Sequence, residues 1–96
     1  MKTGAFFISP PYKMYTVYII YSTSKSRYYV GQTNDIDDRI KRHNNKESIS
    51  TKNGTPWKLI YSTNLQTRSE AVLLETKIKK RGAARYLQDI NFKHEV

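Results

Sequence analysis

A chain of 96 residues fits one compact domain, because two halves would each bury too little apolar surface to offset the entropy lost on folding. Seventeen lysines and arginines against eight acidic residues give a net charge of +9, a positive field that attracts polyanions such as nucleic acid. The absence of cysteine excludes disulfides, thiolate zinc sites and a cysteine nucleophile, and no apolar stretch is long enough for a membrane span, so we expect a cytoplasmic protein.

The first half of the chain predicts a flexible leader followed by a hairpin. Residues 1–13 form the leader, since two adjacent prolines prevent a regular helix there. Residues 14–21 are apolar or aromatic at every position except Thr16, which predicts a central strand covered on both faces. A polar turn then leads to a second strand over residues 28–33, and the short connection favours an antiparallel pair.

A helix, a loop and a third strand are expected next. Asn34 is a suitable N-cap, and Asp37 three positions later resembles a capping box, so the helix should cover residues 35–44. Residues 45–56 are polar and contain Gly and Pro, which predicts a long loop of the kind that often carries function. The strand pattern returns over residues 57–63.

Two further helices complete the predicted domain. Thr67 and Glu70 form a clear capping box, and apolar residues at helical spacing extend the helix to about residue 81. Gly82 should end it, because glycine is the usual residue after a helix. Residues 83–91 have apolar side chains at spacings of three and four, enough for a short third helix.

This order of elements predicts an α+β fold over residues 14–91, with residues 92–96 as a C-terminal tail. The expected architecture is a sandwich-like arrangement, α/β/α, in which helices flank a three-stranded, mainly antiparallel sheet. Two-sided burial of the first strand supports helices on both faces of that sheet. No internal repeat is visible.

Two tyrosine motifs carry the chemistry that the sequence indicates. TVY at residues 16–18 is followed, after ten residues, by YVG at residues 29–31, which places one tyrosine on each strand of the predicted hairpin. Arg39 lies in the first predicted helix, and His43 lies one turn further along the same face. Glu75 lies in the second helix, beside its apolar stripe.

This arrangement resembles the GIY-YIG nuclease superfamily over residues 15–87, and its small stand-alone bacterial branch most closely over residues 29–44. The resemblance implies a metal-dependent endonuclease that hydrolyses phosphodiester bonds in DNA, with structure-specific work in repair or recombination as one option. It assigns the catalytic roles to Tyr18, Tyr29, Arg39, His43 and Glu75. Threonine replaces the first glycine of the family name, and valines replace both isoleucines, changes that preserve a strand.

The chemistry of these side chains also suits the hydrolysis of a phosphodiester bond. Glu75 can hold one Mg²⁺ or Mn²⁺ ion, since such ions keep several waters and take only one or two carboxylates. Arg39 can donate two hydrogen bonds to the scissile phosphate. The resemblance makes Tyr18 or Tyr29 the general base, which requires cationic surroundings to lower a phenol pKa of about 10. His43 is expected to be a hydrogen-bond partner or proton carrier.

Substrate binding is expected around the same motifs, with DNA favoured over RNA. Gly31 would let the backbone pass close to a phosphate or a helix, where a side chain would intrude. Gln32 stands where some members of the superfamily have lysine, a change that removes one possible phosphate contact. The expected backbone track is formed by Lys41, Arg42, Lys79, Lys80 and Arg81.

Each of these residues also has a plain structural interpretation. The tyrosines suit any strand, Arg39 could pair with Asp35, Glu75 could pair with Lys79, and His43 could lie on the surface. Two rival functions stay open as well. One is a nucleic-acid-binding module that kept the scaffold without efficient catalysis, and the other is a basic interaction protein for RNA or a protein partner.

Overall fold

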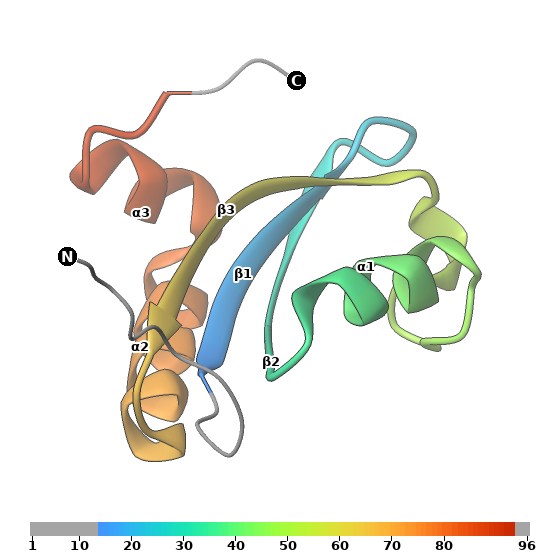
Figure 1. Cartoon of the computed structure of the whole chain (residues 1–96). Helices are drawn as coiled ribbons and strands as arrows, with labels where there is room; N and C mark the ends of the chain where they lie inside the picture. Colours follow the sequence, from blue (N-terminus) through green and yellow to red (C-terminus); the bar gives the residue numbers. More distant parts are fainter. Residues whose placement is uncertain (1–13, 94–96) are drawn as a thin grey trace, which may run out of the picture.

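A computed structural model describes residues 14–93, and in it a three-stranded sheet lies between α1 on one side and α2 with α3 on the other (Figure 1). This confirms the predicted α+β class and element order. The expected leader and residues 94–96 lie outside the described residues. The elements are β1 (Tyr15–Ser22), β2 (Arg27–Thr33), α1 (Ile36–Asn44), the 3-10 helix η2 (Lys52–Gly54), β3 (Trp57–Leu65), α2 (Arg68–Arg81) and α3 (Ala83–Asp89).

The sheet has the order β2-β1-β3, and β1 pairs antiparallel with both neighbours. β1 is therefore the central strand, as its apolar sequence predicts, and β2 is an edge strand. Tyr18 lies opposite Gly31 in the β1–β2 register, and this pairing positions the candidate site described below.

Two apolar clusters cover the two faces of the sheet. On one face, Val17 and Ile19 of β1 pack with buried residues of α2 and α3, including Ile78 and Leu87. On the other face, Tyr18 and Ile20 pack with Trp57, and side chains of α1 cover them. Successive residues of a strand point to opposite faces, so the continuous apolar run in β1 supplies both clusters.

The start of α1 differs from the prediction by one residue. Asp35, rather than Asn34, is the N-cap, because its side chain accepts a hydrogen bond from the backbone nitrogen of Asp38 at 3.1 Å. The Thr33 hydroxyl accepts a hydrogen bond from the backbone nitrogen of Asp35, whose backbone is still extended. The chain therefore enters the helix at Ile36, and the expected capping box of Asn34 with Asp37 was wrong.

The second helix begins and ends as predicted. Thr67 and Glu70 form the complete capping box, and Gly82 ends α2 with a φ of 92°, a conformation that favours glycine. Phe92, which the sequence pattern assigns to the tail, packs against the cluster under α2 and α3 and lies 5.2 Å from the Tyr61 ring, centroid to centroid. None of the helices within residues 14–93 is long and apolar enough to cross a membrane.

Candidate active site at the edge of the sheet

Tyr18 lies across the backbone of Gly31. A Cβ atom built at residue 31 would be only 2.6 Å from the Tyr18 hydroxyl oxygen and 2.8 Å from its Cζ atom. The group that Gly31 accommodates in the structure is the Tyr18 phenol, and the expected close approach of a phosphate to this glycine stays a prediction. This contact directs the phenol from the central strand toward the edge of the sheet at β2.

His43 and Thr51 continue from Tyr18 as a buried chain of hydrogen bonds. The Tyr18 hydroxyl lies 2.8 Å from His43 Nε2, and His43 Nδ1 lies 2.8 Å from Thr51 Oγ1. All three residues are at most 1% exposed. Burial, and next the positive charge of Arg39, lower the pKa of His43, so the ring is neutral at pH 7 and carries a single N–H.

Thr51 belongs to the long loop between α1 and β3, and sequence reasoning missed it. Its backbone oxygen accepts a hydrogen bond from Trp57 Nε1 at 2.7 Å, which fixes the loop against the start of β3. Asn44 adds a second attachment, because its side-chain oxygen accepts from the Trp57 backbone nitrogen at 2.6 Å. A threonine in a polar loop gives no periodic signal, so only its position in space reveals its role as the His43 partner.

Tyr29 joins the same group from β2. Its ring meets the His43 ring edge-on with 5.2 Å between centroids and the Trp57 ring with 6.3 Å. Tyr29 is half-buried, whereas Tyr18 is 1% exposed, so the phenol of Tyr29 is the more accessible of the two.

Burial and positive charge act on the pKa of Tyr18 in opposite directions. Burial raises this pKa most strongly, and the neighbouring Tyr29 side chain raises it further. Arg39 acts in the expected direction, through its charge and a hydrogen bond, but it does not outweigh burial. The Tyr18 pKa therefore lies well above its ordinary value, and Tyr18 is a neutral phenol at any physiological pH.

Arg39 is an exposed residue of α1 and influences both Tyr18 and His43 electrostatically. The alternative pairing with Asp35 is absent, since the Asp35 carboxylate caps the helix instead. Within residues 14–93, the Arg39 side chain forms no salt bridge. Its guanidinium is therefore available for an anion.

Glu75 approaches from α2, on the other face of the sheet. Its Oε1 accepts a hydrogen bond from Gln32 Nε2 at 2.8 Å, and its Oε2 forms an ion pair with Lys79 Nζ at 2.7 Å. Burial alone would raise the pKa of the Glu75 carboxyl, but these two hydrogen bonds and the Lys79 charge outweigh it and hold the pKa below its ordinary value. The charge of Glu75 acts on Tyr18, so the two groups are within electrostatic range across β2.

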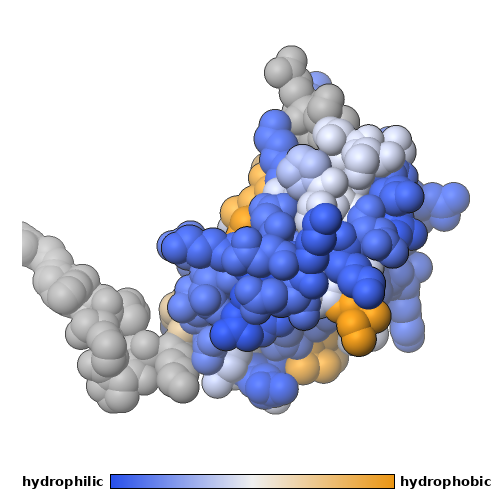
Figure 2. Space-filling view, turned by 90° about the vertical axis from the view of Figure 1, so that its right-hand side faces the viewer, coloured by the Kyte–Doolittle hydropathy of each residue, from blue (hydrophilic) through white to orange (hydrophobic). Residues whose placement is uncertain are grey.

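The basic residues expected to bind substrate are distributed over two sides of the molecule. Lys41 and Arg42 lie on α1, whose side of the molecule is mostly hydrophilic (Figure 2). The others lie in the last turn of α2: Lys79, Lys80 and Arg81. Several are already engaged: Arg42 with Asp38 at 2.8 Å, Lys79 with Glu75, and Arg81 with Asp89 through two hydrogen bonds of 2.7 and 3.0 Å.

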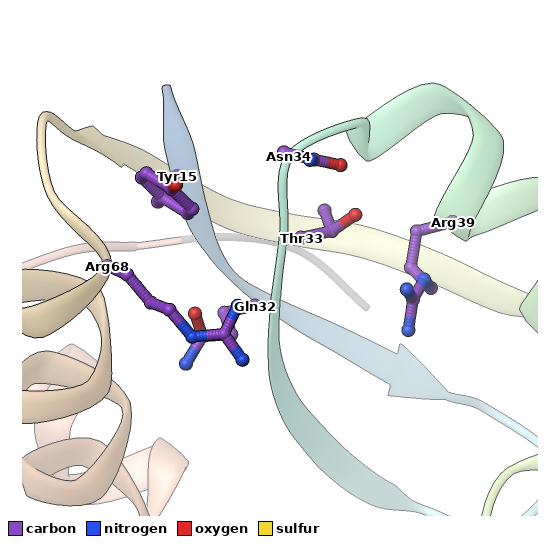
Figure 3. Close-up of a pocket in the computed structure, with 6 residues that line it drawn as sticks. All are labelled: Tyr15, Gln32, Thr33, Asn34, Arg39 and Arg68. Carbon is purple, nitrogen blue, oxygen red and sulfur yellow. The ribbon is translucent and has the colours of Figure 1, made fainter. Parts of the chain in front are cut away.

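A cavity of about 280 Å³ opens beside Arg39. Its lining comes from β1, β2, α1 and α2 and from the chain that joins β2 to α1, and consists of Tyr15, Gln32, Thr33, Asn34, Arg39 and Arg68 (Figure 3). Gln32 links this cavity to Glu75 through its side-chain amide. Of this lining, sequence reasoning named only Gln32 and Arg39 as functional residues.

The donor set limits which metal could bind here. No group of three or more His, Cys, Asp or Glu side chains within residues 14–93 is arranged to hold an ion. Glu75 alone, with a carboxylate held near the sheet edge and 17% of its side chain exposed, suits a hard cation that keeps most of its water ligands. Such an ion would need the Glu75 oxygen that Lys79 occupies.

The fold and this group of side chains define a small α+β domain with paired tyrosines at the edge of its sheet. The sequence profile of the GIY-YIG catalytic domain matches residues 14–88, and the chain belongs to this family. It is also 34% identical over 68 residues to a UPF0213 protein of Halobacterium salinarum, an alignment that covers 70% of this chain and 87% of that protein. No solved structure matches the chain with significance.

Proposed function

We propose that this chain is a divalent-metal-dependent endonuclease that hydrolyses phosphodiester bonds in DNA. The observation that carries the proposal is the buried hydrogen-bond chain from Tyr18 through His43 to Thr51, within electrostatic range of Glu75. Arg39 lies beside this chain and forms no salt bridge within residues 14–93. Membership of the GIY-YIG family supports nuclease chemistry on this scaffold.

Arg39 and Tyr29 are the groups that meet the substrate. Arg39 donates to the non-bridging oxygens of the scissile phosphate, and its charge stabilises the negative charge that grows there in the transition state. Tyr29, more exposed than Tyr18, positions the attacking water through its hydroxyl.

Tyr18 and His43 move the proton. Because Tyr18 stays neutral, it takes a proton from the water only as its own proton passes to His43 Nε2 at 2.8 Å. The water oxygen then forms the new bond to phosphorus, the bond to the leaving oxygen breaks, and that oxygen takes a proton from solvent. The Thr51 hydroxyl can accept from Nδ1–H, which is the tautomer that leaves Nε2 free to accept the proton of Tyr18.

Glu75 is the ligand for one Mg²⁺ or Mn²⁺ ion. When bound, the ion would polarise the phosphate and lower the pKa of a coordinated water. Gln32 holds Oε1 and so orients the carboxylate, while Lys79 occupies Oε2 and must release it. Lys79, once released, is a free cation beside the substrate backbone.

A second candidate function follows from the same carboxylate. Both Glu75 oxygens are engaged by protein groups, which favours a nucleic-acid-binding module without catalysis if Lys79 does not release its oxygen. Both functions predict DNA binding, and they differ in the need for Glu75 and metal.

The discriminating experiment compares wild type, Glu75→Gln and Asp89→Asn on branched, flapped, nicked and single-stranded DNA, with Mn²⁺ or with EDTA. Asp89→Asn is the matched control, because it removes one carboxylate from α3 whose salt-bridge partner, Arg81, is not one of the candidate catalytic residues. The endonuclease proposal expects cleavage by wild type and Asp89→Asn with Mn²⁺ only. Equal cleavage by Glu75→Gln would indicate a contaminating nuclease and defeat the proposal, and binding without cleavage by all three would establish the non-catalytic module.

A further inference from the structure

The cavity beside Arg39 is built for an anion. Its lining contains two guanidinium groups, four neutral side chains and no carboxylate (Figure 3). Its volume of about 280 Å³ is several times the roughly 30 Å³ that one water occupies in the liquid, so a phosphate group with its hydration fits. The lining therefore attracts negative charge and contains no carboxylate of its own.

The two arginines lie on opposite sides of the edge strand. Figure 3 shows Arg68 and Gln32 on one side of the β2 ribbon and Arg39 on the other. Arg39 comes from α1 and Arg68 from the first residue of α2, so they reach the cavity from elements on the two faces of the sheet. One strand of nucleic acid that crosses the edge of β2 would meet both.

Arg68 lines the cavity and has no acidic partner among the described residues. Neither Arg39 nor Arg68 forms a salt bridge within residues 14–93, whereas Arg42 and Arg81 are each paired with an aspartate. The end of α2 itself is not the binding group, because the capping box of Thr67 and Glu70 already satisfies it. The side chain of Arg68 carries the charge into the cavity.

We propose that Arg68 binds a second backbone phosphate of the DNA strand, next to the phosphate that Arg39 holds. This subsite rests on the proposed function for its substrate, but it makes a claim about binding rather than cleavage. Guanidinium groups bind phosphate through two parallel hydrogen bonds, and contacts to phosphate position a strand without reading its sequence. The pair of arginines would therefore fix the direction in which the strand crosses the catalytic tyrosines.

The test measures binding in EDTA, so that its result is independent of catalysis. The probe is a fluorescent single-stranded oligothymidylate, and its affinity is followed as the salt concentration increases. Each lost phosphate contact should reduce the slope of log K against log salt by about 0.7 on a single strand. Arg68→Gln should show this reduction and bind about fivefold more weakly, and Arg68→Lys should fall between Arg68→Gln and wild type.

The matched control is Arg27→Gln, which removes an exposed arginine at the opposite end of β2 and should leave slope and affinity unchanged. A second arm uses thymidine dinucleotides with or without a terminal phosphate, followed by NMR. Wild type should gain affinity from the second phosphate, and Arg68→Gln should lose that gain.

Three results would overturn the subsite. The first is a wild-type slope in Arg68→Gln, and the second is an equal loss in Arg27→Gln, which would indicate general charge alone. The third is binding of inorganic phosphate as tightly as the dinucleotide, which would make the cavity a small-anion site. Failure of wild type to cleave DNA would defeat the proposed function and leave the expected binding results unchanged.

Discussion

Replacing Gly31 with alanine tests the geometry of the candidate site at its tightest contact. The added Cβ would lie 2.6 Å from the Tyr18 hydroxyl oxygen, 2.8 Å from Cζ and 3.2 Å from Cε2. Real Cβ atoms essentially never approach another heavy atom this closely, so the ring must move. It has little room, because Tyr18 is 1% exposed and bonded to His43.

Three free-energy terms set the expected size of the effect. Overpacking a buried site costs about 1–3 kcal/mol, and losing the hydrogen bond between Tyr18 and His43 costs about 0.5–1.5 kcal/mol. Alanine also lowers the conformational entropy of the unfolded chain, which raises the free energy of unfolding by about 0.4–1 kcal/mol where alanine can adopt the native backbone conformation. Gly31 is not among the residues with positive φ, so this gain applies. The expected net loss in the free energy of unfolding is about 2 kcal/mol.

The measurement is a double-mutant cycle of Gly31→Ala with Tyr18→Phe, by urea denaturation. Phenylalanine removes the hydroxyl, and with it the closest contact and the hydrogen bond to His43, although the contact with Cζ at 2.8 Å remains. Gly31→Ala should therefore cost about 1 kcal/mol less in the Tyr18→Phe background than in wild type. Two effects that add within about 0.5 kcal/mol, or a Gly31→Ala variant as stable as wild type, would refute the steric account.

Two further predictions concern His43 and Lys79. Burial lowers the pKa of His43, so below about pH 6.5 the unfolded chain takes up a proton that the folded chain does not. The free energy of unfolding should therefore decrease as the pH is lowered through this range. The free energy of unfolding should change by at most about 1.4 kcal/mol per pH unit, and denaturation at several pH values should show that this dependence is lost in His43→Gln. An equal dependence in that variant would contradict the burial of a neutral ring. Lys79→Gln frees one oxygen of Glu75 and should tighten Mn²⁺ binding, measured by calorimetry, about two- to fivefold. The control Lys77→Gln removes the same charge from α2 and should leave Mn²⁺ binding unchanged. Equal changes in both variants would show that only the net charge of the protein matters.

Local patterns in the sequence predicted the elements because each pattern has a local physical cause. The apolar run of β1 reflects burial on both faces, and the capping box of Thr67 with Glu70 satisfies the first backbone nitrogens of α2. The same reasoning placed the cap of α1 one residue early. Asn34 and Asp35 are both good N-caps, and only the hydrogen bond from the Asp35 backbone nitrogen to Thr33 decides between them.

The site was predictable only as far as residue types and spacing allow. Tyr18, Tyr29 and His43 lie together as their spacing in the hairpin and α1 suggests. Thr51 and Arg68 could not be predicted, since a threonine in a loop and an arginine at a helix start are common everywhere. Their roles depend on how the long loop and α2 approach the sheet.

The pKa values of the site residues depend on how burial and neighbouring charges add up in the folded protein, which residue spacing in the sequence does not reveal. Arg39 lowers the pKa of Tyr18 as its proximity suggests, but burial of the phenol acts in the opposite direction and is larger. For Glu75 the balance is reversed, because Lys79 and Gln32 outweigh burial. The sequence identifies which charges are present, and only the packing decides which term is the larger.

The position of β2 at the edge of the sheet explains how residues from opposite faces can form one site. Side chains on the two faces of a central strand are separated by the sheet itself, since neighbouring strands continue on both sides. Within residues 14–93 the sheet ends at β2, so Tyr18 reaches the edge over Gly31 while Gln32 reaches Glu75 on the other face. A segment of chain that paired with the free edge of β2 would separate the tyrosines from Glu75, so this edge must stay open for a phosphate to contact both groups.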